Sequence, residues 1–360
     1  MYNGLKEYVK FLEEKGELRR IKEFVDPVLE IACATDIESK KPGCGKALLF
    51  ENTGTAFPVL TNLTGSEARV RYALGTSPQE TGARLVEMID TMLGRGRKWH
   101  DLWKMLQVTR RVASWKPRPH KGHAPCQDVV QYAAQLSQLP ALKEWPQDTG
   151  RFLTLTHVHT CNPLTGKLYT GLFRMQLTDD TTAILHCPAD SPIWGFLSDC
   201  THRLPVIVCL GGDPVYSWIA STPLPEAVDP FLLAGFLRGK PVEMVKCFTQ
   251  EMLIPADCDL VIEGYIQKSE EKVDALYPRF HASCISHRFD AICPANVPGA
   301  LSSESKYEQE ARESLVLPLV RHFHGPAAQD FPTQNPEPGR PGTGMHEEAL
   351  SARMSELLKD

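Results

Sequence analysis

The feature that most constrains this 360-residue chain is a series of short β-like runs that fills its middle. Apolar and β-branched residues gather at 152–160, 168–177, 182–186, 205–210 and 259–266, and turn signals such as Asn-Pro and Gly-Asp-Pro separate them. Many short strands with frequent turns are typical of a β-barrel or a β-sandwich. The middle of the chain is therefore predicted to be one of these two architectures.

The first hundred residues carry both helix and strand signals. Apolar residues recur at helical spacing over 4–15, which predicts an amphipathic helix, and again over 85–92. Short apolar runs at 47–51 and 58–60 predict buried strands. We therefore expect an α/β domain over residues 1–114.

Composition divides the rest of the chain. Residues 115–126 are basic and rich in proline, which predicts a linker, and 127–324 form the β-rich domain with one helix predicted over 228–238. Residues 325–360 begin with five prolines and four glycines in 20 positions, which predicts a largely disordered tail. A helix over 346–358 is possible, with nothing evident to pack against.

Charge and hydropathy exclude several functional classes. Lys plus Arg number 39 and Asp plus Glu 44, a net charge of −5 that gives no reason to expect nucleic acid as a partner. No apolar run approaches the roughly 18–20 residues that span a bilayer. The 11 scattered cysteines contain no Cys-x-x-Cys pair. We expect a cytoplasmic protein with reduced, mostly buried thiols and no transmembrane segment.

Three side chains in the β-rich region carry chemistry. His157 and His159 would lie on one face of a strand, as a possible metal pair, although polar residues on a half-exposed strand explain them equally well. Arg174 lies in an alternating strand, and a guanidinium in a β-rich core needs an anionic partner. A structural salt bridge and an anionic ligand both remain open for Arg174.

Segments in a distinctive order run collinearly through residues 1–320. They are 5–18, 46–52, 58–65, 125–127, 171–176, 210–214, 222–225, 234–238, 245–247, 262–265 and 277–281. Taken together, this set resembles the UbiD family of decarboxylases.

The resemblance implies an α/β fold: an N-terminal α/β domain followed by a split β-barrel of the flavin-reductase type. It implies reversible decarboxylation of an aromatic or α,β-unsaturated acid, such as a polyprenyl-4-hydroxybenzoate in ubiquinone or menaquinone biosynthesis. The cofactor would be prenylated FMN, made by a separate flavin prenyltransferase, and Mn²⁺ would bridge the protein to the flavin phosphate. A homo-oligomer is also expected.

The resemblance also assigns site residues. Arg174 matches a family arginine that contacts the cofactor and the substrate carboxylate, which makes it the candidate catalytic residue. The residues expected to hold the flavin are Leu172, Phe173, Arg174, His186, Cys187 and Pro188.

The family's three metal ligands match Tyr169, Asp190 and Pro230 in this chain. A phenol is a poor ligand for a hard cation, and proline has no side-chain oxygen, so only Asp190 is left as a tentative manganese ligand. Asp229 is adjacent to the third position, but on a helix its side chain would point about 100° away.

A family loop that carries two acids has no counterpart between Lys272 and Tyr277, and Glu270 and Glu271 belong to the segment before it. The family's C-terminal α/β domain has no counterpart either, so the chain looks truncated. The sequence therefore predicts a UbiD-like carboxy-lyase whose activity is impaired. The alternative is a non-catalytic protein of the same fold, or an FMN-binding protein.

Overall fold

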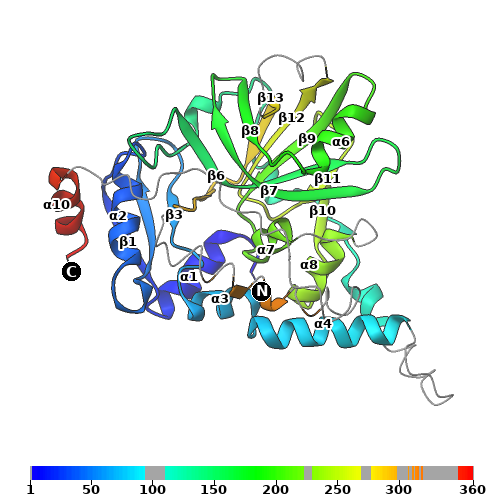
Figure 1. Ribbon diagram of the computed structural model, residues 1–360, viewed down its shortest axis with the longest axis horizontal. Helices are drawn as coiled ribbons and strands as arrows, with labels where there is room; N and C mark the ends of the chain where they lie inside the picture. Colours follow the sequence, from blue (N-terminus) through cyan, green and yellow to red (C-terminus); the bar gives the residue numbers. More distant parts are fainter. Residues whose placement is uncertain are drawn as a thin grey trace.

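The computed structural model describes residues 2–93, 110–222, 229–268, 277–297 and 348–359, together with residues 307, 310, 311, 313–315 and 318. Figure 1 shows a small sheet with helices, drawn in blue, beside a larger barrel drawn mainly in green and yellow. The expected order of an α/β unit followed by a β-barrel is confirmed.

The N-terminal unit is built on a four-stranded sheet in the order β1-β2-β3-β14. Its elements in the first hundred residues are α1 (Leu5–Glu14), β1 (Leu18–Phe24), α2 (Glu30–Ser39), β2 (Ala47–Asn52), β3 (Val59–Thr61), α3 (Glu67–Leu74) and α4 (Pro78–Leu93). α1 forms where the apolar period predicts it, because Leu5, Tyr8 and Leu12 are buried while the charged residues between them are exposed.

The fourth strand of this sheet comes from the part of the chain that follows the barrel strands. β14 (Cys293–Pro294) pairs parallel with β3. The Cys293 amide donates to the Pro58 carbonyl at 2.9 Å, and the Ala295 amide donates to the Leu60 carbonyl at 2.8 Å. The chain therefore forms all six barrel strands before it returns to complete the first sheet.

Six strands close into the barrel in the order β12-β9-β6-β7-β8-β13, and β12 pairs with β13 to complete it. They are β6 (Arg151–Cys161), β7 (Leu168–Leu177), β8 (Thr182–His186), β9 (Arg203–Leu210), β12 (Leu260–Gln267) and β13 (Arg279–His287). A short strand, β5 (Val129–Gln131), pairs with β13 outside this ring. Alternate residues of the six strands fill the interior, as the period of two predicts.

Shorter elements surround the barrel. They are a three-stranded sheet of β4 (Arg118–Pro119), β10 (Glu243–Lys246) and β11 (Leu253–Pro255), and the helices α6 (Pro192–Asp199), α7 (Val215–Ser221) and α8 (Pro230–Arg238). α7 packs against the outer side of β6 and β7, and α8 packs against α7 (Figure 1). β4 lies within the segment predicted as a linker, and it pairs with β10.

The C-terminal helix corrects one expectation. α10 (Glu348–Leu357) packs against α2 at the edge of the molecule (Figure 1). Met354 and Leu358 are buried in one cluster with Ile31 of α2. The expectation that this helix has nothing to pack against is wrong, because its apolar face meets α2. The Pro/Gly-rich stretch before it lies outside the described residues.

The cysteine prediction is confirmed: all eleven cysteines are free thiols, and nine of them are buried. Among the helices that the structure describes, none combines the length and the apolar character needed to cross a bilayer.

Candidate functional site

β7 presents two different faces, because successive side chains of a strand point to opposite sides. Phe173 and Met175 point into the barrel and belong to its core. Leu172 and Arg174 alternate with them, so they lie on the outer face of the barrel. This outer face is the one that α7 approaches.

Arg174 forms a buried ion pair on that outer face. Its Nη2 atom donates to Oε2 of Glu144 at 2.6 Å. The Glu144 side chain is fully buried, and the Arg174 side chain is only 17% exposed. The guanidinium also lies over the ring of Phe152, 4.2 Å from its centroid. Of the two sequence interpretations of Arg174, the structure contains the salt bridge.

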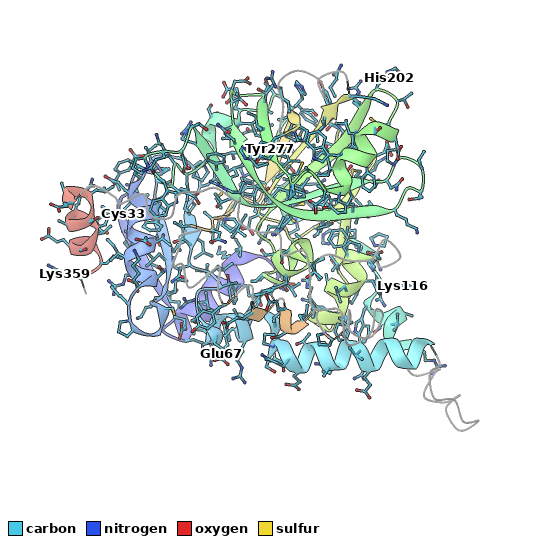
Figure 2. The ribbon with its side chains drawn as sticks, in the orientation of Figure 1. Cys33, Glu67, Lys116, His202, Tyr277 and Lys359 are labelled. Carbon is cyan, nitrogen blue, oxygen red and sulfur yellow. The ribbon has the colours of Figure 1, made fainter. Side chains whose placement is uncertain are left out.

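Aromatic rings lie on one side of this ion pair and stack on one another. His186 on β8 lies directly opposite Arg174 in the strand register. Its ring stacks on Tyr277 with centroids 4.3 Å apart and meets the edge of Phe152 at 5.3 Å. Figure 2 labels Tyr277 on the barrel. One cationic group is thus set among flat rings on the outer face of the barrel.

Glu144 is held in place by both structural units. The preceding residue, Lys143, forms a bridge with Val28 of the N-terminal unit, and Leu142 forms a bridge with Phe152 of β6. The Asp148 carboxylate accepts from the Glu144 amide at 3.1 Å. The sequence analysis missed Glu144, because it lies in an irregular segment and its partner is 30 residues away. The unexplained need of Arg174 for an anion was the one available signal.

The residues predicted to hold a flavin divide between the two faces. Arg174 and His186 lie on the outer face, and Pro188 is exposed. Phe173 and Cys187 are buried in the barrel core, where burial raises the pKa of the Cys187 thiol to about 12. The side chains of Phe173 and Cys187 therefore cannot contact a group bound outside the barrel.

The positions that match the metal ligands do not form a manganese site. The Tyr169 hydroxyl is hydrogen-bonded to Ser191, and burial raises the pKa of Tyr169. Asp190 is exposed, and Pro230 is the first residue of α8. The Asp229 carboxylate caps α8 by accepting from the Phe231 amide at 2.8 Å. No cluster of three potential ligands occurs among the described residues, so manganese does not fit them.

His157 and His159 do lie on one face of β6, as predicted, but each has a protein partner. His157 Nε2 is 3.0 Å from the Ser217 hydroxyl, and His159 Nδ1 is 2.7 Å from the Thr170 hydroxyl. Burial lowers the pKa of His157 to about 4 and that of His159 to about 3, so both imidazoles are neutral at pH 7. The described residues supply no third ligand, and the metal-pair interpretation is not supported.

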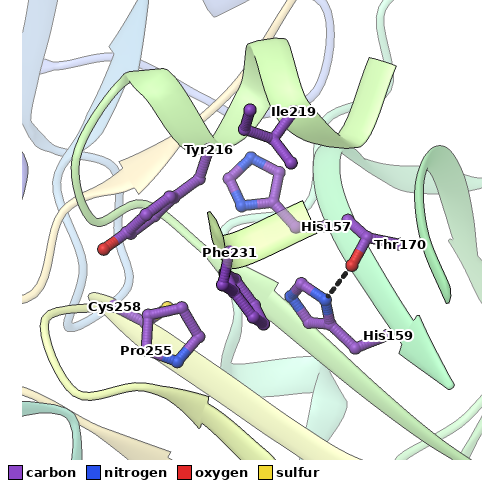
Figure 3. Close-up of a pocket in the computed structure, with 8 residues that line it drawn as sticks. All are labelled: His157, His159, Thr170, Tyr216, Ile219, Phe231, Pro255 and Cys258. Atoms are coloured by element: carbon purple, nitrogen blue, oxygen red, sulfur yellow. Dashed lines mark hydrogen bonds between the residues drawn. The ribbon is translucent and has the colours of Figure 1, made fainter. Parts of the chain in front are cut away.

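A small cavity lies between these histidines, α7 and α8 (Figure 3). It is lined by His157, His159, Thr170, Tyr216, Ile219, Phe231, Pro255 and Cys258. His157 is paired across the strands with Leu172, so the cavity is on the same barrel face as Arg174. Its volume of about 220 Å³ includes solvent at its mouth. Sites for drug-sized ligands have about 300–1,000 Å³, so this cavity is too small for prenylated FMN.

Glu270, Glu271 and the shortened connection that follows them lie outside the described residues. Glu144 is the carboxylate that the described residues bring to Arg174.

Family models match most of the chain. Residues 9–89 match the 3-octaprenyl-4-hydroxybenzoate carboxy-lyase N-terminal domain, and residues 118–301 match the Rift-related domain of the same family. An uncharacterised protein of Aquifex aeolicus is 35% identical over 92% of this chain and 71% of its own length. An uncharacterised protein of Archaeoglobus fulgidus is 34% identical over 90% of this chain and 69% of its own length. An uncharacterised Helicobacter pylori protein is 28% identical, and the chain spans only 55% of it.

Solved structures of the same fold are enzymes. The evolved dimeric form of the UbiD-class enzyme HmfF from Pelotomaculum thermopropionicum, in complex with prenylated FMN, has a TM-score of 0.72 at 23% identity and covers 89% of this chain and 73% of its own. The closed form of vanillic acid decarboxylase from Sedimentibacter hydroxybenzoicus has a TM-score of 0.73 at 22% identity and covers 90% of this chain and 70% of its own. With both family models matched in order and two relatives above 30% identity, this chain belongs to the UbiD family.

Proposed function

We propose that this chain is a UbiD-type carboxy-lyase of aromatic or α,β-unsaturated acids in which catalysis is impaired. Family membership supports the reaction class. The observation that carries the proposal for this chain is Arg174 over the ring of Phe152 and opposite His186, whose ring in turn stacks on Tyr277. A guanidinium fork binds a carboxylate through two N–H groups, and flat rings beside it favour an aromatic or conjugated acid.

Impairment is proposed because the positions that would hold the cofactor are altered. A carboxylate is lost as CO₂ only if the electron pair it leaves behind is accepted elsewhere, which is the chemistry a bound flavin supplies. In this chain Tyr169 and Pro230 stand where two metal ligands are expected, and Phe173 and Cys187 are in the barrel core. Loss of metal ligands removes the charge stabilisation that a bound metal would supply, which is worth several kcal/mol in the transition state.

The proposal extends to partners and substrate. A flavin prenyltransferase would be the source of the cofactor, and a homo-oligomer would be the working form. The name of the HmfF neighbour records a dimer for that enzyme. A polyprenyl-4-hydroxybenzoate is one candidate acid, since the matching family models carry the name of that carboxy-lyase.

The test is co-expression with a flavin prenyltransferase, followed by measurement of flavin mass, manganese content and CO₂ release. The acids to supply are 4-hydroxybenzoate, 3,4-dihydroxybenzoate and vanillate. We expect flavin and manganese far below one per chain, and turnover at least about 100-fold below that of S. hydroxybenzoicus vanillic acid decarboxylase prepared in the same way. Stoichiometric cofactor with comparable turnover would contradict impairment. Stoichiometric FMN with no turnover of any acid would favour the non-catalytic alternative.

A further inference from the structure

The Glu144–Arg174 ion pair is buried on the outer face of the barrel. Glu144 is fully buried, and its Oε2 lies 2.6 Å from Arg174 Nη2. A carboxylate and a guanidinium are both costly to remove from water, and a buried pair is retained only when the partners satisfy each other. Glu144 therefore supplies an anion that Arg174 requires in the folded chain.

We propose that Glu144 occupies the carboxylate-binding position of Arg174, so that an external aromatic carboxylate binds there only when the Glu144 side chain is removed or withdrawn. Whether Glu144 or an external acid is bound, Arg174 Nη2 donates to a carboxylate oxygen. That the displaced ligand is an aromatic acid rests on the proposed function and on the ring of Phe152 beneath the guanidinium, which meets the ring of His186. Glu144 is thus a specificity-determining residue that keeps the site closed to external acids.

The position of Glu144 is set by the contact between the two units. Lys143 forms a bridge with Val28, and the Lys143 carbonyl accepts from the Leu29 amide at 2.8 Å. On the other side, the Leu142 and Phe152 backbones exchange hydrogen bonds of 2.8 and 2.7 Å. Glu144 is therefore held where the N-terminal unit and the barrel meet, whereas Arg174 lies on β7 of the barrel. The contact between the two units therefore sets where the Glu144 carboxylate lies, and this carboxylate is what closes the site.

The experiment measures binding of benzoate to the purified full-length chain by calorimetry, without flavin, metal or turnover. In Glu144→Ala, the space and the charge of the side chain are removed together, so benzoate should bind at least tenfold more tightly than to the wild type. Benzamide, which has the same ring without a charge, should bind no more tightly to Glu144→Ala than to the wild type. The double variant Glu144→Ala/Arg174→Gln should bind benzoate no more tightly than the wild type does.

A matched control is Glu263→Gln, which alters another fully buried glutamate. Its carboxylate accepts from the Phe248 amide at 2.8 Å and from the Thr249 amide at 2.6 Å, away from the Arg174 pair. This variant should lose stability without any gain in benzoate affinity. A gain in Glu263→Gln equal to that in Glu144→Ala would show a general effect of loosening and would overturn the proposal.

Two further results would overturn it: wild-type chain that binds benzoate as tightly as Glu144→Ala, or a gain that persists without Arg174. If Glu144→Ala does not fold, Glu144→Gln retains the side-chain volume and removes the charge. Benzoate should then raise the melting temperature of Glu144→Gln more than that of the wild type, and an equal shift would count against the proposal. Because binding is measured without cofactor, failure here is separate from failure of the carboxy-lyase proposal, which is decided by turnover.

Discussion

The imidazoles of His157 and His159 are buried on the outer face of the barrel as neutral groups, and burial lowers their pKa values to about 4 and about 3. In the unfolded chain a histidine has a pKa near 6.5, so that state binds protons which the folded state does not. The free energy of unfolding therefore rises with pH between about 3 and 6.5. The contribution of these groups is complete above that window and is lost as the pH falls.

His159→Gln tests this at one residue. The amide can keep a hydrogen bond to Thr170 but cannot take up a proton. Between pH 7 and pH 4, the free energy of unfolding should fall by about 2–3 kcal/mol less in this variant than in the wild type. Urea unfolding at a series of pH values measures the difference. In His202→Gln, which changes an exposed histidine, the free energy of unfolding should depend on pH as it does in the wild type. If His159→Gln also shows the wild-type pH dependence, burial of His159 does not contribute to it.

At the scale of elements, local periodicity decided what could be predicted. α1 and β2 were predictable because their apolar residues recur within one segment. β4 and β14 each have two residues, and only a remote partner makes them strands, so no local pattern indicates them. The same limit applies to the site. The need of Arg174 for an anion was readable, but Glu144 was not, since their pairing depends on the contact between the two units.

The interface of α10 with α2 gives a prediction at this scale. Met354 is 1% exposed and packs in the same cluster as Ile31 and Cys33, so Met354→Ala should remove buried contacts on both helices. We expect a loss of about 2–3 kcal/mol in the free energy of unfolding, measured by urea titration, with faster hydrogen exchange in α2. Ser355→Ala, on the exposed side of α10, should change stability by less than about 0.5 kcal/mol. If the two variants are equally stable, α10 does not contribute through this face.

At the scale of the whole molecule, one buried cluster joins the N-terminus to the barrel. Arg238 Nε lies 3.1 Å from Asp213 Oδ2, and its Nη2 lies 2.9 Å from Asp257 Oδ2. The same Nη2 donates to the Tyr2 carbonyl at 3.1 Å, while the Tyr2 amide donates to Asp213 at 3.0 Å. Burial raises the pKa of Asp213, so this carboxylate depends on Arg238 for its charge.

Arg238→Met should therefore destabilise the whole chain. The change retains much of the side-chain volume but leaves two carboxylates without their cation, which costs about 3–5 kcal/mol. Urea unfolding measures the loss, and hydrogen exchange should show reduced protection in α1, which follows Tyr2. Lys240→Met is the matched control, because Lys240 contacts the same N-terminal segment through Asn3 at an exposed site. Equal losses in the two variants would show that the buried cluster has no special role.

The return of the chain through β14 has a consequence for recombination between related genes. The first sheet takes its fourth strand from residues 293–294, so the N-terminal unit is not one continuous stretch of the chain, and the barrel lies within it in sequence. A genetic crossover between the first unit and the barrel would join a sheet of one ancestor to the closing strand of another. Such a recombinant would keep the fourth strand of its first sheet only if β3 and β14 still matched, although one precedes the barrel in the chain and the other follows it.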